Sequence, residues 1–139
     1  MIVLDTNVLS ELMKATPAQS VVRWVAKQPV TSLYTTSITQ AEVLHGILLL
    51  PAGKRRTAVE AAAEAMFKEA FSDRILGFGS DAAYPYARIA AQRRRAGRPI
   101  SHFDAQIASI AKATGAAVAT RNVADFDGCE IKVINPWDA

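Results

Sequence analysis

The stretch that decides the fold is MIVLDTNVLS, residues 1–10. Residues 2–4 form a short, entirely apolar run, which is typical of a strand buried in a parallel sheet. The run ends at the carboxylate of Asp5. Ligands of open α/β sheets bind just beyond the carboxyl ends of the strands. Asp5 is therefore at a position where such a fold binds its ligand. A second interpretation stays open, in which Asp5 or Thr6 merely caps the following helix.

Outward from this stretch, short apolar or β-branched runs alternate with longer amphipathic ones. We expect strands over residues 2–4, 32–36, 74–78, 116–120 and 130–134. We expect helices over residues 7–14, 16–28, 37–50, 57–71, 80–95 and 101–114, with a short helical turn over 122–126. This alternation predicts an α/β fold with a mainly parallel sheet of about five strands. No repeat, low-complexity tract or linker interrupts it, so we expect a single domain over residues 1–139.

Composition narrows the class of protein. Half of the 139 residues are apolar and 21% are charged, as in globular domains. The chain has one cysteine, Cys129, which excludes an internal disulfide and fits a reducing compartment, so we expect a cytoplasmic protein. No apolar run is long enough to span a bilayer, and we expect no membrane association. The net charge of +3 is a mild indication of an acidic partner.

Four carboxylates follow predicted strands or begin predicted helices: Asp5, Glu42, Asp104 and Asp125. In a parallel sheet these positions meet at one edge, where the carboxylates repel one another unless a cation lies among them. Hard oxygen ligands favour Mg²⁺ or Mn²⁺, and the two widely separated histidines do not suggest a zinc site. Gly46 lies one turn after Glu42, where a missing side chain leaves room for a ligand.

Each of these acids also has an ordinary structural interpretation. Glu42 can be a surface residue of its helix. Asp104 can be only the acid of a capping box that begins at Ser101, and Asn122 can form another cap pair with Asp125. Taken together, polar groups aimed at one sheet edge favour a metal site more than any of them does alone.

Basic residues cluster at residues 54–56 and at residues 93–95 with Arg98. Either cluster can be a solvated helix end. The second precedes the Asp104 helix by a short loop, where it can hold a phosphate backbone beside the acidic pocket. Carboxylates with a metal ion and nearby arginines are typical of nucleases that cleave phosphodiesters. No phosphate-binding glycine loop and no nucleophile elbow follows a strand.

Five segments in order match a known family. They are Ile2–Asn7, Ser37–Glu42 with Gly46, Asp104–Ala108, Ala119–Asn122 continuing to Asp125-Phe126, and Asn135–Trp137. With these segments the whole chain resembles the PIN-domain ribonucleases, specifically the VapC-like and FitB-like toxins of bacterial type II toxin–antitoxin pairs.

The resemblance implies a three-layer α/β/α sandwich. It implies Mg²⁺, for which Mn²⁺ can substitute, held by Asp5, Glu42 and Asp104. It also implies that Thr6 and Thr120 form hydrogen bonds with the carboxylates or with a metal-bound water.

The chain departs from the family pattern at Asn122, where the family often has an acid. Asp125, three residues on, can supply that acid instead, while Asn122 can still offer an amide oxygen. We include both among the candidate catalytic residues. The departure weakens the case for a second tightly held metal ion.

The resemblance further implies a metal-dependent endoribonuclease, an RNA substrate, a homodimer and a small antitoxin that blocks the acidic pocket. The antitoxin's helical tail would lie in a groove near the hairpin of residues 38–71. The apolar stripe of that hairpin can equally be core or a dimer face. The alternative function is a non-catalytic PIN-like module that binds RNA or protein, and Asn122 is the residue in its favour.

Overall fold

A single five-stranded parallel sheet forms the centre of the protein. The computed structural model describes all residues, 1–139. The strands are β1 (Ile2–Leu4), β2 (Leu33–Thr36), β3 (Ile75–Leu76), β4 (Ala117–Ala119) and β5 (Val133–Ile134). Their order is β3-β2-β1-β4-β5, and every neighbouring pair is parallel. The predicted α/β class is confirmed, and the first strand of the chain is the central one.

Six α-helices surround the sheet. They are α1 (Thr6–Leu12), α2 (Gln19–Lys27), α3 (Ser37–Leu48), α4 (Lys54–Ala65), α5 (Ala83–Arg95) and α6 (His102–Thr114). Shorter turns are η1 (Val30–Ser32), the π-helical η2 (Met66–Ala70), η3 (Ser80–Ala82) and η4 (Val123–Phe126). No helix combines the length and apolar character needed to cross a membrane.

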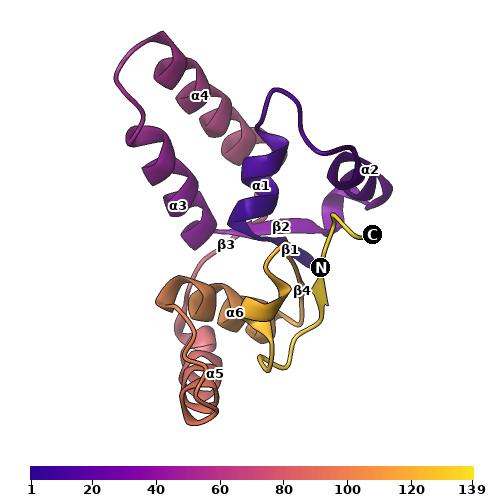
Figure 1. The fold of residues 1–139 in the computed structure, drawn as a ribbon, viewed down its shortest axis with the longest axis vertical. Helices are drawn as coiled ribbons and strands as arrows, with labels where there is room; N and C mark the ends of the chain where they lie inside the picture. The colour runs from indigo at the N-terminus through magenta and orange to yellow at the C-terminus, as the bar shows by residue number, and fades with distance from the viewer.

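The helices form two layers, with α1 to α4 on one face of the sheet and α5 and α6 on the other (Figure 1). Successive side chains of a strand point to opposite faces, so β1 contributes to both apolar clusters. Leu4 packs in the cluster that includes Phe67, whereas Val3 packs in the cluster that includes Ile107. The three-layer sandwich implied by the family resemblance is confirmed.

The helix that carries Glu42 begins at Ser37, where the sequence predicts it. The N-cap of α3 is Thr36, and its hydroxyl accepts a hydrogen bond from the Thr39 N–H at 3.1 Å. Thr36 is the last residue of β2, so the strand passes into the helix with no loop. Glu42 is therefore held close to the carboxyl end of β2.

The ends of α6 are as predicted. The Ser101 hydroxyl accepts a hydrogen bond from the Asp104 N–H at 3.2 Å, which caps the N-terminus and places Asp104 in the first turn. Gly115, at φ +70°, ends the helix in the left-handed conformation that glycine adopts without strain.

Candidate functional site

Asp5 follows the central strand β1, Thr120 follows its neighbour β4, and the two residues meet at the carboxyl edge of the sheet. The Asp5 N–H donates to the Ala119 carbonyl at 3.0 Å, which continues the ladder past the end of β1. The Thr120 hydroxyl donates to Asp5 Oδ2 at 2.9 Å. Asp5 is only 5% exposed and Thr120 is fully buried. This contact agrees with the role that the family resemblance implied for Thr120.

Asn7 is a member of this group that sequence reasoning did not single out as a site residue. Its Nδ2 lies 3.1 Å from Asp5 Oδ2 and 3.2 Å from Thr120 Oγ1, and it donates to both. Its Oδ1 accepts a hydrogen bond from the Arg121 N–H at 3.0 Å. Asn7 thus ties the start of α1 to the segment after β4. Its sequence signals are its place two residues after Asp5 and its membership of the Ile2–Asn7 segment that matches the family.

Glu42 is joined to the same edge through Thr6, the first residue of α1. The Thr6 hydroxyl lies 2.8 Å from Glu42 Oε1 and 3.2 Å from Thr39 Oγ1. A hydroxyl has one proton, and the shorter bond to the charged carboxylate is the stronger of the two. A small cavity of about 210 Å³ lies beside Glu42 and Gly46, and a Cβ at Gly46 would meet nothing within 4 Å. The predicted space for a ligand is present.

Burial and mutual repulsion raise the pKa of two of the acids. Burial is the main cause for Asp5, whose pKa rises to about 6, and the charges of Asp104 and Glu42 add to it. The Thr6 N–H and the Thr120 hydroxyl offset part of this rise.

Asp104 is half-buried at the start of α6, and its pKa is also raised. Burial is again the largest cause, followed among the raising effects by the charges of Asp125 and Glu42. The Ser101 hydroxyl and the charge of Arg93 act in the opposite direction. The four predicted carboxylates therefore act on one another and form one electrostatic cluster. Asn122 is exposed, and its N–H donates to Thr120 Oγ1 at 3.1 Å.

The donor chemistry of this cluster suits a hard divalent cation. It offers carboxylate oxygens, and the pKa of Asp5 and of Asp104 is raised first by burial and further by the charges of the neighbouring acids. As the side chains lie, however, no three acidic, histidine or cysteine side chains are grouped closely enough to hold a metal ion. A cation bound by Asp5, Glu42 and Asp104 would require their side chains to turn toward one another.

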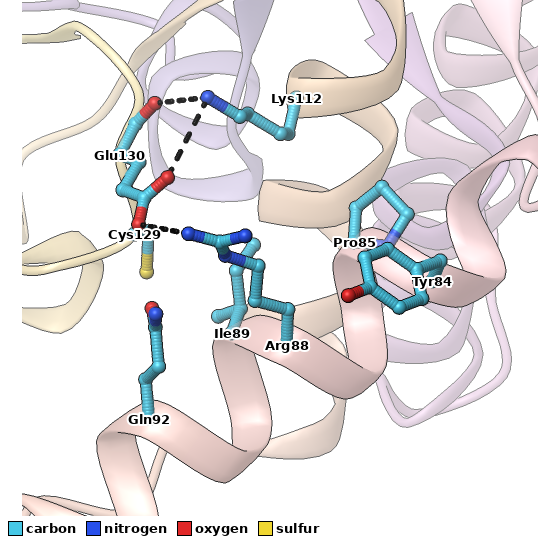
Figure 2. Close-up of a pocket in the computed structure, with 8 residues that line it drawn as sticks. All are labelled: Tyr84, Pro85, Arg88, Ile89, Gln92, Lys112, Cys129 and Glu130. Carbon is cyan, nitrogen blue, oxygen red and sulfur yellow. Dashed lines mark hydrogen bonds and ion pairs between the residues drawn. The ribbon is translucent and has the colours of Figure 1, made fainter.

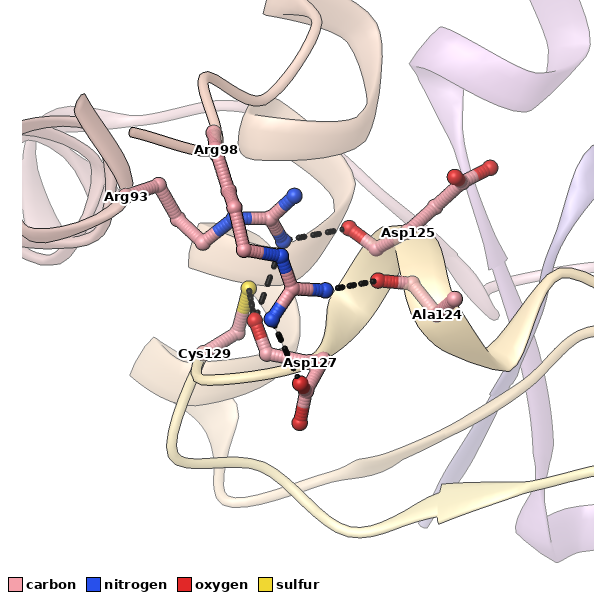
Figure 3. Close-up of polar contacts among 6 residues, drawn as sticks. All are labelled: Arg93, Arg98, Ala124, Asp125, Asp127 and Cys129. Carbon is pink, nitrogen blue, oxygen red and sulfur yellow. Dashed lines mark hydrogen bonds and ion pairs between the residues drawn. The ribbon is translucent and has the colours of Figure 1, made fainter. Parts of the chain in front are cut away.

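The arginine cluster at the end of α5 differs from the expectation. Arg93 is buried and donates to main-chain carbonyls, and Arg98 forms an ion pair with Asp127 at 2.8 Å (Figure 3). Arg93 is therefore not available to hold a phosphate backbone. Arg94 and Arg95 are exposed.

A separate cavity of about 320 Å³ lies between α5 and the segment before β5, and none of the four carboxylates lines it (Figure 2). Its lining includes Arg88 and Lys112, which both approach Glu130, at 3.4 and 3.9 Å. The positive charges of Arg88 and Lys112 are thus paired with Glu130. The cavity is not part of the acidic edge.

Comparison with known proteins gives the family. A family model described as the PIN domain matches residues 2–127. The chain is 43% identical over 138 residues to VapC ribonuclease Y4jK of Sinorhizobium fredii, covering 99% of both proteins. It is 36% identical over 137 residues to toxin FitB of Neisseria gonorrhoeae, again covering 99% of both. The crystal structure of FitAcB from the same organism superposes with a TM-score of 0.94 at 35% identity, covering 100% of both chains.

A parallel α/β/α fold with acids gathered at the carboxyl edge agrees with these matches. The chain belongs to the PIN-domain family, in the group that includes the VapC and FitB toxins. The resemblance drawn from the sequence is confirmed.

Proposed function

We propose that this protein is the toxin of a toxin–antitoxin pair and acts as a Mg²⁺- or Mn²⁺-dependent endoribonuclease. The observation that carries the proposal is the cluster of carboxylates at the carboxyl edge, with the pKa of Asp5 raised to about 6. The relative from Sinorhizobium fredii is named a ribonuclease, which supports RNA as the substrate.

In this proposal Asp5, Glu42 and Asp104 hold the metal ion. When bound, the ion would lower the pKa of a water molecule and neutralise charge that develops on the phosphate. Metal binding favours ionised ligands, so it opposes the effect of burial on the Asp5 pKa.

The neutral side chains around the acids orient them. Thr120 and Asn7 both donate to Asp5 Oδ2, which fixes that carboxylate against the end of β4. Thr6 holds Glu42 through one oxygen, Oε1. These contacts restrict the rotation of two proposed ligands, one just after β1 and one on α3, and such supporting hydrogen bonds tune metal sites generally.

The test is RNA cleavage by antitoxin-free protein, with total transfer RNA in Mg²⁺ and in EDTA. Asp5→Asn is the matched variant, because it keeps the size of the side chain and removes its charge. We expect discrete fragments from the wild type with Mg²⁺ and a loss of cleavage of at least about 100-fold in the variant, by analogy with the removal of other charge-stabilising groups from active sites. Equal cleavage by Asp5→Asn would show that the site is misplaced.

We also propose a cognate antitoxin and a homodimer. The relative named toxin FitB has a solved structure as FitAcB, which supports a bound partner. A groove of about 480 Å³ runs between α3, α4, η2 and β3. Half of its lining is apolar, at Leu44, Phe67 and Ile75, and half is polar or charged, at Gln40, Glu64 and Lys68. An amphipathic helix that lays its apolar face into a groove is a common mode of recognition. The antitoxin should abolish cleavage when added in equal amount.

A second candidate function is a PIN-like module that binds RNA without cleaving it. Asn122 in place of an acid favours it, as does the lack of a preformed group of three metal ligands. The two functions differ in their response to metal, since a ligand that binds only the folded state raises the melting temperature. A clear rise with Mn²⁺, abolished in Asp5→Asn, would favour the nuclease.

A further inference from the structure

Arg93 joins three main-chain carbonyls with one buried guanidinium group. Its Nε donates to the Arg98 carbonyl at 2.7 Å, and its Nη1 donates to the carbonyls of Asp125 and Asp127 at 2.8 and 3.0 Å. Arg93 is only 8% exposed. It therefore fastens the end of α5 to the turn η4, which carries Asp125 (Figure 3).

The main chain of Asp125 is held on both sides. Its N–H donates to the Asn122 carbonyl at 3.0 Å, and its carbonyl accepts from Arg93. The next residue, Phe126, is 1% exposed and packs in the apolar cluster beneath α6. The Asp125 side chain is exposed, and its carboxylate points away from both Arg93 and Arg98 (Figure 3). The backbone is thus fixed, while the carboxylate remains unpaired.

We propose that Arg93 is a positioning residue of the acidic site, which acts through Asp125 so that Asp125, rather than Asn122, supplies the fourth acidic side chain. This inference rests on the proposed nuclease function. It identifies Asp125 as the source of the acid that this chain lacks at position 122, and it gives the buried arginine a role in placing that acid.

The chemistry of arginine suits this role. A guanidinium group presents five N–H donors in a rigid fork, so one side chain can satisfy several carbonyls. A lysine has the same charge but a flexible stem and a single nitrogen, and it cannot reproduce the fork. The turn that carries Asp125 also contacts the site directly. The Asn122 N–H donates to Thr120 Oγ1, the hydroxyl that binds Asp5. Phe126 packs in the same apolar cluster as Ile107 of α6, the helix whose first turn carries Asp104.

The opposite explanation is that Arg93 acts by charge alone, since its charge also lowers the pKa of Asp104. Arg93→Lys separates the two explanations, because it keeps the charge and loses the fork. Arg93→Gln is the second variant, to be used if Arg93→Lys does not fold. The matched control is Asp127→Asn, which removes the exposed ion pair with Arg98 from the same turn and leaves the Arg93 bonds in place.

The test is a double-mutant cycle between Arg93→Lys and Asp125→Asn, with two measurements on the full chain. The first is cleavage of an RNA that the wild type cuts, analysed as kcat and KM. The second is the Mn²⁺ concentration that gives half of the full rise in melting temperature, which does not depend on turnover.

We expect each single variant to lower kcat about tenfold to a hundredfold, as is typical of groups that support metal ligands, with KM little changed. Each single variant should also raise the Mn²⁺ concentration that gives half of the full rise in melting temperature. The double variant should be no worse than Asp125→Asn alone, and Asp127→Asn should match the wild type.

Three results would overturn the inference while leaving the nuclease intact. In the first, the losses in kcat of the two single variants multiply in the double variant. In the second, Arg93→Lys keeps full activity. In the third, Asp125→Asn cleaves RNA and responds to Mn²⁺ as the wild type does. The last of these is decisive even if no Arg93 variant folds. A wild-type protein that neither cleaves RNA nor responds to Mn²⁺ would instead overturn the proposed function, and the inference with it.

Discussion

Asp5 is a buried carboxylate whose two side-chain hydrogen-bond donors, Asn7 and Thr120, are both neutral. It takes part in none of the ion pairs of the protein. Hydrogen bonds from neutral groups offset only part of the cost of burying a charge, so the folded state favours the protonated acid. A charged Asp5 carboxylate in the metal-free site therefore lowers the free energy of unfolding at neutral pH.

This cost predicts an unusual dependence of stability on pH. The Asp5 pKa is about 6 in the folded state, above its ordinary value of 3.8. Between these two values the folded protein binds more protons than the unfolded one, so its free energy of unfolding falls as pH rises. The contribution of Asp5 is fully present below about pH 4 and lost above about pH 6, and it amounts to about 3 kcal/mol.

Urea denaturation in EDTA at several pH values, with Asp5→Asn alongside, measures this contribution. The variant should be more stable than the wild type at pH 7, and the difference should shrink toward pH 4. Parallel pH profiles for the two proteins would show that Asp5 is not the source.

Among the elements, α6 links the stability of the fold to the site. Its N-cap, Ser101, bonds to the N–H of Asp104, and Asp104 is itself a proposed metal ligand. The following helix is buried along much of its length, at residues such as Ile107 and Ile110. Loss of the Ser101 cap therefore destabilises the first turn of α6, which carries Asp104.

Ser101→Ala should lower the free energy of unfolding by about 1 kcal/mol, because it leaves the Asp104 N–H without its partner. Ser101→Thr keeps the hydroxyl and should change stability by less than about 0.5 kcal/mol. Urea midpoints at constant m-value are the measurement. Equal losses in the two variants would mean that the cap bond contributes nothing.

The order and type of these elements could be predicted because each has a local signal. The apolar run of β1, the cap at Ser101 and the glycine after α6 all lie within a few residues of what they determine. Element ends were less well predicted: α4 begins at Lys54 rather than at residue 57, since its first turn is a basic run with no apolar periodicity.

The site could be predicted only in part, for a related reason. Asp5, Glu42 and Asp104 follow strands or begin helices, so the fold class alone brings them to one edge. Arg93 could not be foreseen, because its partners are carbonyls such as that of Asp125, 32 residues away. Main-chain carbonyls have no sequence signature, and the arginine run resembled an ordinary solvated helix end.

For the whole molecule, the prominent surface feature is the α3–α4 hairpin, which projects from the sheet (Figure 1). Its inner stripe is core, since Ala63, Phe67 and Phe71 are buried. At its far end Leu48 and Leu49 are 50% and 72% exposed. This end of the hairpin is the place where we expect a second copy to pack, since apolar side chains there stay in contact with water in the isolated chain.

We expect the isolated chain to elute in gel filtration at twice its mass of 15.0 kDa. Leu49→Lys should shift it toward the monomer, because a charge there opposes burial. Val30→Lys is the matched control, as Val30 is 68% exposed on η1, outside the hairpin. An unchanged dimer in Leu49→Lys would place the dimer face elsewhere.

The central position of β1 has a consequence for synthesis on the ribosome. Asp5 leaves the exit tunnel well before its partners, since its ladder partner is Ala119 and its hydroxyl donor is Thr120, 115 residues later. Contacts of such long sequence separation form only once most of the chain is free to fold. A nascent chain therefore cannot complete the acidic edge before residues 119 and 120 have left the ribosome.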